Sequence, residues 1–246
     1  MFSVDLNCDM GEGIGNDELI MPWISSANIA CGYHAGDEQT IYETVALCLK
    51  HNVSIGAHPS FADRENFGRS EMQLPLKEIA RLVSEQIGIL ATIANRKGAR
   101  LNHVKPHGAL YNMAAKDVLL AGAIARAVKD FDPGLVVYAL AGSHLIREAD
   151  KAGLKTASEV FADRTYQDDG SLTARTSPNA LVKDAATALA QVLQMIKENA
   201  VTAVSGKTIA IRADTICIHG DSPKAVEFAE TIRKRLKQEA IDIQTI

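Results

Sequence analysis

The chain has 246 residues, a hydrophobic content of 47% and a formal net charge of −4. This slightly acidic balance offers no basic surface for nucleic acid or an anionic membrane, so a small-molecule ligand is expected. No apolar run reaches the roughly 18 residues of a membrane span. No low-complexity linker interrupts the pattern, which predicts a single domain over residues 1–246.

The cysteines favour a reducing compartment. Cys8, Cys31, Cys48 and Cys217 form no C-x-x-C pair and no zinc-finger spacing. No basic and apolar leader precedes them, so we expect a cytoplasmic protein with free thiols. Three of them end apolar runs, which predicts small hydrophobic groups in a barrel interior.

Short apolar runs and longer amphipathic segments alternate along the chain. Expected strands cover residues 2–8, 28–31, 53–57, 135–140, 157–161, 215–218 and 241–246. Expected helices cover residues 38–51, 75–97, 117–129, 143–152 and 178–198. Asp37 is a plausible N-cap, and Ser177-Pro178 and Ser222-Pro223 each carry the signal of a cap followed by a first-turn proline. The sequence therefore predicts repeated strand–helix units.

Residues 102–112 are the chemically densest stretch. A lysine, two histidines, a tyrosine and two asparagines surround the point where a short apolar run meets Pro106. Proline has no N–H for a central strand's ladder, so this cluster should lie at a strand's carboxyl end. Parallel α/β folds keep their sites at such ends.

Seven or eight strand–helix units predict either a closed parallel barrel or an open doubly wound sheet. Polar residues follow nearly every expected strand, whereas an open sheet would concentrate them at one crevice. We therefore predict an α/β fold with a (β/α) barrel of the TIM-barrel type, whose mouth gathers these side chains.

Two glycine-bearing stretches do not qualify as nucleotide-binding motifs. Residues 11–15 read G-x-G-x-G without a strong helix directly after them, and residues 205–208 (SGKT) lack the first glycine of a Walker A motif and precede a strand. We interpret residues 205–208 as a turn.

Four histidines lie at expected strand ends: His34, His58, His107 and His219. With neighbouring carboxylates they could hold a divalent transition metal, although no H-E-x-x-H motif occurs. Mg²⁺ held through carboxylates and phosphate oxygens is an equally reasonable use of the same mouth. Both alternatives stay open.

Six segments together resemble the LamB/YcsF family, the family to which the A subunits of prokaryotic 5-oxoprolinase belong. They are DLNCDMGE (5–12), NIACGYHAGD (28–37), GAHPS (56–60), VKPHGALYN (104–112), EVFADR (159–164) and IHGD (218–221). The resemblance implies an irregular seven-stranded (β/α) barrel related to the glycoside hydrolase/deacetylase barrel. It also implies ATP-dependent opening of 5-oxo-L-proline to L-glutamate, with ATP as co-substrate, Mg²⁺, and separate B and C subunits as partners.

A lactam is a poor electrophile, so this chemistry needs groups that neutralise phosphate, place a water and deprotonate it. As catalytic candidates we assign Asp9, His34, His58, Lys105, His107, Glu159 and Asp221. As substrate- or phosphate-binding candidates we assign Glu12, Asp37, Arg64, Arg69, Tyr111, Asp163, Arg164 and His219. The division of roles within each group stays open.

The polar loop at residues 60–74 is expected to cover the mouth and to carry Arg64 and Arg69 to an anionic ligand. Two other functions use the same residues. One is a metal-dependent amide or ester hydrolase without ATP, and the other is a non-catalytic carbohydrate or amino-acid binding subunit.

Overall fold

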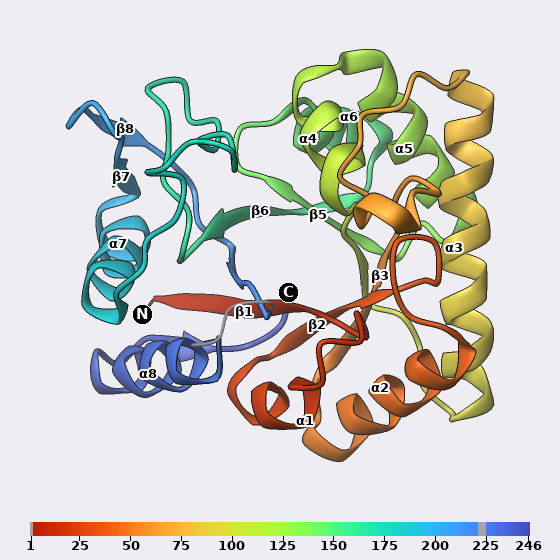
Figure 1. Ribbon diagram of the computed structural model, residues 1–246, viewed down its shortest axis with the longest axis horizontal. Coiled ribbons are helices and arrows are strands. Elements are labelled where there is room, and N and C mark those ends of the chain that lie inside the picture. The colour runs from red at the N-terminus through yellow and green to blue at the C-terminus, as the bar shows by residue number, and fades with distance from the viewer. Residues whose placement is uncertain (1, 221–224) are drawn as a thin grey trace.

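A closed barrel of seven parallel strands forms the centre of the computed structural model, which describes residues 2–220 and 225–246 (Figure 1). The barrel closes because β1 pairs with β2 on one side and with β9 on the other. In sheet order the strands are β1 (Ser3–Met10), β2 (Ser26–Ala30), β3 (Ser54–His58), β4 (His103–Val104), β5 (Val136–Leu140), β6 (Lys155–Phe161) and β9 (Thr215–Ile218). The predicted seven-stranded barrel is confirmed.

Helices surround this barrel (Figure 1). They are α1 (Asp17–Ile20), α2 (Glu38–His51), α3 (Leu76–Arg96), α4 (Gly108–Lys116), α5 (Val118–Phe131), α6 (His144–Ala152), α7 (Ala185–Glu198) and α8 (Ala225–Gln238), with 3-10 turns η1 (Met21–Trp23) and η2 (Arg64–Asn66). Asp37 caps α2 as predicted, because its carboxylate accepts the N–H of Thr40. None of the helices in the described part of the chain has both the length and the apolar character needed to cross a bilayer.

The start predicted for α7 is wrong. Ser177 and Pro178 lie in a turn, and the helix begins at Ala185, where the Asp184 carboxylate accepts the N–H of Thr187. Residues 180–182 instead pair with residues 163–165, which follow β6. The carbonyl of Ala180 accepts the N–H of Thr165, and the N–H of Val182 donates to the carbonyl of Asp163. These long-range bonds use the backbone groups that a first helical turn would need. The second predicted cap signal, Ser222-Pro223, lies outside the described residues.

Two small pairings lie outside the seven-stranded barrel. β7 (Ala200–Thr202) and β8 (Thr208–Ala210) form an antiparallel hairpin, and residues 203–207 make its turn, with Gly206 at φ +87°. The interpretation of residues 205–208 as a turn, and not a phosphate loop, is confirmed for residues 205–207. Thr208 is the first residue of β8. β10 (Asp242–Ile243) adds in parallel to the start of β1, as the final strand expected from the sequence.

The barrel interior is polar, in contrast to the aliphatic layers usual in such barrels. Asp5, Asn7 and Asp9 alternate along β1 and bond to inward residues of other strands, whereas Leu6 and Cys8 pack in apolar clusters. All four cysteines are buried and free, as expected. The prediction that three of them lie in the barrel interior holds for Cys217, whose Sγ is 3.2 Å from Lys105 Nζ. It is wrong for Cys8 and Cys31, which pack with Cys48 in an apolar cluster.

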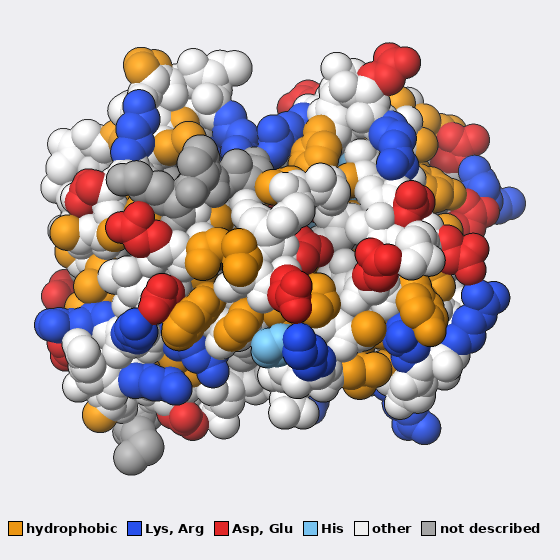
Figure 2. Space-filling model, turned by 60° about the horizontal axis from the view of Figure 1, so that its bottom comes forward, with side chains coloured by type: hydrophobic (Ala, Val, Ile, Leu, Met, Phe, Trp, Pro, Cys, Tyr) orange, Lys and Arg blue, Asp and Glu red, His pale blue; other side chains and the backbone are white. Residues whose placement is uncertain are grey.

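Charge on the surface is mixed. Figure 2 shows one face of the protein, on which Lys and Arg side chains are interspersed with Asp, Glu and apolar groups. This distribution agrees with the net charge of −4 and with the expectation of a small-molecule ligand.

Candidate functional site

A cavity of about 650 Å³ lies at the carboxyl ends of the barrel strands. Its wall includes Asp9 of β1, His58 of β3, Lys105 after β4 and His219 after β9. The predicted convergence of strand-end residues at one mouth is therefore confirmed for these four positions. The volume is in the range of sites for small ligands.

Lys105 forms the centre of the cavity floor, where it lies between two carboxylates. Its Nζ is 2.7 Å from Glu159 Oε1 and 2.9 Å from Asp9 Oδ1, and its side chain is only 3% exposed. Burial by itself would lower the pKa of Lys105, but Asp9 and Glu159 outweigh burial and hold that pKa well above its ordinary value. Lys105 is therefore a fixed cation.

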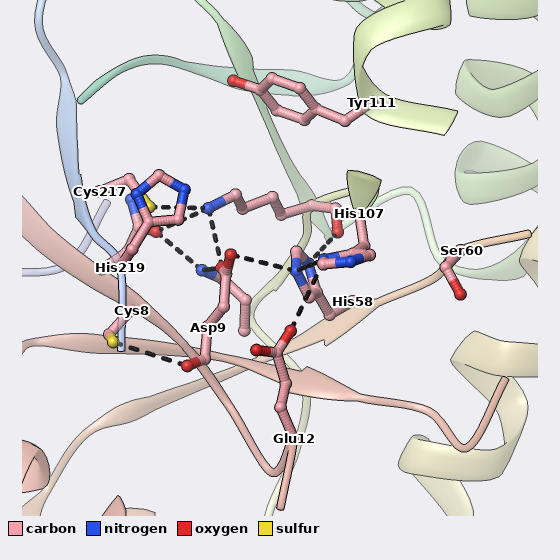
Figure 3. Close-up of polar contacts among 12 residues, drawn as sticks. Cys8, Asp9, Glu12, His58, Ser60, His107, Tyr111, Cys217 and His219 are labelled. Atoms are coloured by element: carbon pink, nitrogen blue, oxygen red, sulfur yellow. Dashed lines mark hydrogen bonds and ion pairs between the residues drawn. The ribbon is translucent and has the colours of Figure 1, made fainter. Parts of the chain in front are cut away.

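Asp9 connects Lys105 to the histidines (Figure 3). Its second oxygen lies 3.4 Å from His58 Nε2. Burial raises the pKa of Asp9, but His58 and Lys105 more than compensate, so the pKa lies well below its ordinary value. Asp9 thus stays ionised and is a poor proton acceptor.

Tyr111 holds the other carboxylate. Its hydroxyl donates to Glu159 Oε2 at 2.7 Å, and both side chains are buried. Burial and the charge of Glu159 raise the pKa of Tyr111 well above its ordinary value. The phenol therefore stays protonated and orients Glu159.

Asp163 and His219 form a pair on the far side of Lys105 from the other histidines. His219 Nδ1 lies 2.8 Å and 2.9 Å from the two oxygens of Asp163, so its N–H donates to that carboxylate. Burial raises the pKa of Asp163, but His219 outweighs burial and the net shift is downward. Asp163 fixes the tautomer that leaves His219 Nε2 as a proton acceptor, as in hydrolases with an oriented base.

The three remaining strand-end histidines lie close to Glu12. Figure 3 shows two of them, His58 and His107, beside this carboxylate. The rings of His34 and His107 stack with centroids 3.9 Å apart, and His107 Nδ1 lies 2.9 Å from His58 Nε2. One ligand atom from each of these histidines and from Glu12 lies within 4.8 Å of all the others. Burial and the neighbouring His58 lower the pKa of His34 to about 3, and the same causes lower the pKa of His107.

Glycine lets the loop at residues 60–74 approach this cluster. Gly68 has φ +67°, and a Cβ there would lie 3.0 Å from His107 Cδ2 and from His34 Cβ. Its carbonyl accepts the N–H of Ala109 at the start of α4. The loop therefore contacts the cavity wall, and its backbone approaches His34 and His107 closely.

Cationic side chains line the outer cavity. Arg69 and Arg164 lie there as predicted, together with Lys116 and Arg175, which sequence reasoning missed. Arg164 is nearly buried, and its Nη2 donates to the carbonyl of Thr173 at 2.6 Å. Burial and the neighbouring Arg175 lower the pKa of Arg164. Arg175 lies in the second polar loop, at residues 165–177. The length of this loop and its position after a strand were the sequence features that could have identified Arg175 as a site residue.

Two predicted site residues, Arg64 and Asp37, lie outside the cavity lining and bond to backbone groups elsewhere. His34, Glu159 and Asp163 do not line the cavity either, but each contacts a residue that does. Arg64 donates to the carbonyls of Gly32 and Gly36, so it ties two loops together and does not line the cavity. Asp37 is committed to its helix cap. Arg64 therefore does not reach the cavity as predicted, and Asp37 serves the helix cap that the sequence also predicted. Asp221 lies outside the described residues.

Comparison with known proteins gives the same fold and extensive sequence similarity. The chain is 57% identical over 249 residues to a protein of Shouchella clausii named as the A subunit of 5-oxoprolinase, covering 99% of this chain and 98% of that protein. The crystal structure of a "lactam utilization protein" from Thermus thermophilus superposes with a TM-score of 0.93 at 43% identity and 100% coverage of both chains. A family 4 carbohydrate esterase from Streptomyces lividans shares the fold alone, with a TM-score of 0.54, 12% identity and coverage of 100% of this chain and 93% of that one.

The family assignment follows from the extent of these matches. Residues 4–246 match the LamB/YcsF family. The matched range includes all the cavity residues named above, from Asp9 to His219. The chain belongs to the LamB/YcsF family.

Proposed function

We propose that this chain is the A subunit of an ATP-dependent 5-oxoprolinase, which opens 5-oxo-L-proline to L-glutamate with release of ADP and phosphate. The observation that carries the proposal is full-length similarity, at 51–57% identity, to relatives that are named as the A subunit of 5-oxoprolinase. The four free thiols, together with the use of ATP, favour a cytoplasmic complex.

The cavity offers what the reaction needs. Phosphoryl transfer from ATP to the lactam oxygen creates a leaving group and makes the ring carbon a better target for water. Lys105 supplies a buried positive charge close to where negative charge develops. His219, oriented by Asp163, can take the proton from the attacking water. The lactam C–N bond then breaks, and the ring nitrogen gains a proton to become the amino group. A second water hydrolyses the side-chain carboxyl phosphate that this step leaves, which releases phosphate and gives glutamate.

The substrate's own charge matches the outer wall. 5-Oxoproline carries a carboxylate, and a phosphorylated intermediate would carry further negative charge. Arg69, Arg164 and Arg175 line the same cavity as Lys105 and can neutralise both anionic groups. We therefore place the carboxylate and the phosphoryl group among these arginines.

ATP is expected to reach this site with the help of the partner subunits. The turn at residues 205–208 belongs to the β7–β8 hairpin and not to a phosphate loop. Separate B and C subunits, with Mg²⁺ bridging the phosphates, would supply the remaining contacts.

Glutamate formation from 5-oxoproline and ATP tests this proposal. The chain alone, the B and C subunits alone, and the three together are compared, with ADP measured in parallel. We expect turnover only from the three together, with one ADP released for each glutamate formed. Full ATP-coupled activity of the isolated chain would contradict the role as a partner-dependent subunit.

The same assay separates two alternatives. Hydrolysis without ADP release would identify a metal-dependent amide or ester hydrolase, whose barrel resembles that of the carbohydrate esterase. Unchanged turnover of the complex carrying cavity variants of this chain would identify a non-catalytic binding subunit.

A further inference from the structure

We propose that Glu12, His34, His58 and His107 form a binding site for one divalent transition-metal ion, with Zn²⁺ as the representative. The proposal rests on the geometry of this four-residue cluster and does not depend on the 5-oxoprolinase function. It assigns a ligand atom to each residue: one imidazole nitrogen from each histidine and a carboxylate oxygen from Glu12.

Hydrogen bonds on the outer side of the cluster fix which nitrogen of each histidine carries its proton. His58 Nδ1 lies 2.7 Å from the carbonyl of Lys105, and His107 Nε2 lies 2.9 Å from the carbonyl of Phe67. A carbonyl only accepts, so each of these nitrogens must donate an N–H.

The third histidine follows the same rule through a hydroxyl. His34 Nδ1 lies 2.9 Å from Ser60 Oγ, which itself donates to the carbonyl of Phe61. With its one proton on that carbonyl, Ser60 Oγ accepts the N–H of His34. All three histidines thus donate outward to an oxygen, which is the arrangement that orients metal-binding imidazoles.

The other ring nitrogen of each histidine points inward, toward the remaining ligand atoms of the cluster. His58 Nε2 is 2.9 Å from His107 Nδ1, and His34 Nε2 is 3.3 Å from Glu12 Oε1. His107 Nδ1 is also 3.6 Å from that carboxylate oxygen. Around a tetrahedral ion with bonds of about 2.0–2.1 Å, neighbouring ligand atoms lie about 3.3–3.4 Å apart. These three separations bracket that value, and the remaining pairs of ligand atoms lie within 4.8 Å.

A cation at the centre resolves a conflict among these inward atoms. With every histidine neutral, each close pair would consist of two acceptors and no proton. One added proton could lie between His58 and His107, but it would leave His34 Nε2 facing the carboxylate of Glu12. A single metal ion satisfies all four atoms together.

A second group of potential ligands, Asp9, Cys217 and His219, is less suited to an ion. The ammonium group of Lys105 lies 2.9 Å from Asp9 and 3.2 Å from Cys217 Sγ, so a cation already occupies that position. A divalent ion there would be repelled. This contrast locates the metal on the histidine side.

The ligand set also indicates the class of metal. Three imidazoles with one carboxylate suit Zn²⁺, Co²⁺ or Ni²⁺, whereas Mg²⁺ and Ca²⁺ prefer oxygen ligands. Glu12, His58 and His107 line the cavity, so a bound ion would lie in its wall and could polarise an oxygen of a ligand there.

Metal binding by the purified full-length chain tests the site directly. Chelator-treated protein is titrated with Zn²⁺ by calorimetry and with Co²⁺ by visible absorption. We expect one ion per chain, and Zn²⁺ should raise the melting temperature. His34→Gln, His58→Gln and Glu12→Gln should each weaken binding by about 100-fold or more, and Ser60→Ala, which removes an outer-shell acceptor, by about 10–100-fold.

Two control variants complete the design. His144→Gln removes a histidine that contacts Arg147 on the surface, and Cys217→Ser removes the sulfur of the second group. Both should bind Zn²⁺ like the wild type, and the Co²⁺ spectrum should lack a thiolate band. The melting temperature and circular dichroism of each chelated variant show that it is folded, so lost binding reports a lost ligand. Absence of stoichiometric binding by the folded wild type, or binding that Cys217→Ser abolishes and His34→Gln and His58→Gln retain, would overturn the proposal.

Discussion

Asp5 and Asp9 lie four residues apart on the same inward face of β1, yet their environments are opposite. Asp5 is fully buried, and its carboxylate accepts hydrogen bonds from the hydroxyls of Ser25, Ser26 and Thr215. Asp9 lies at the cavity floor, next to Lys105 and His58. Burial raises the pKa of Asp5, and the hydroxyls only partly offset it, whereas the pKa of Asp9 is lowered well below its ordinary value.

The difference shows that a charged partner, more than depth of burial, sets the state of a carboxylate in this barrel. Neutral hydroxyls satisfy the hydrogen bonds of Asp5 but supply no opposite charge. We call Asp5 and the three hydroxyl residues around it the closed layer, because all four side chains are buried. Thr215 links this layer to Asn7, whose amide donates to the Thr215 hydroxyl. We therefore expect Asp5 to serve structure and the Asp9–Lys105 pair to serve function, and four predictions test this division.

The largest effect is expected for Lys105→Met. In the proposed mechanism this change removes the buried charge next to the reacting atoms, so we expect turnover of the assembled complex to fall by about 10²–10⁴-fold. It also leaves Asp9 and Glu159 facing each other without a cation, which should lower the free energy of unfolding by about 3–5 kcal/mol. Rates are measured at a temperature where circular dichroism shows the variant folded. A folded variant with wild-type turnover would refute the assignment.

Arg69→Ala and Arg64→Ala form a matched pair in one loop. Arg69 lines the cavity, whereas Arg64 bonds to the carbonyls of Gly32 and Gly36 outside it. Losing a charged contact to an anionic substrate should raise the KM for 5-oxoproline by about 10–100-fold in Arg69→Ala. Arg64→Ala should leave KM within about threefold of the wild type. Equal effects of both changes would mean that the loop acts as a whole and not through Arg69.

Thr215→Val tests the closed layer. The valine keeps the shape of threonine but removes a hydroxyl that donates to Asp5 at 2.6 Å and accepts from Asn7 at 2.7 Å. Leaving these buried groups unpaired should lower the free energy of unfolding by about 1–3 kcal/mol, measured by urea denaturation. Turnover of the folded complex should not change. A large loss of turnover at unchanged stability would place the Asp5 layer in the functional machinery.

The smallest effects concern the pH dependence of stability. The folded pKa of Asp9 lies below the ordinary value of 3.8, so its contribution to stability is present above that pH and is lost as pH falls through the folded pKa. The folded pKa of Asp5 is raised, so its contribution is present below 3.8 and is lost as pH rises through the folded pKa.

Urea unfolding of Asp9→Asn and Asp5→Asn across the acid range measures both contributions. Asp9→Asn should reduce the loss of stability on acidification, and Asp5→Asn should reduce the loss on raising pH from 3.8. The slope of the free energy of unfolding with pH is the readout, since each substitution also shifts stability at all pH values. Slopes that change in the same direction would contradict the assigned environments.

Much of the architecture could be read from local signals. The helix at residues 38–51, its Asp37 cap and the strand ends at His58 and Lys105 were predictable because caps, apolar spacing and proline act over a few residues. The start of α7 was not, because long-range pairing of Ala180 and Val182 overrides the Ser177-Pro178 signal. The same limit applies to Arg175, whose place in the cavity depends on how a long loop folds back.

By itself, the sequence determined most of the strands and helices, the closed barrel, and the convergence of polar strand ends on one mouth, since most β/α units carry their own periodicity and stop signals. Tertiary structure decided the partners. Barrel closure places β1 beside β9, and it brings Lys105 between Asp9 and Glu159. It also separates His219 from the cluster of His34, His58 and His107. Which of these side chains come into contact depends on strand register and loop conformation, which residue spacing along the chain does not specify.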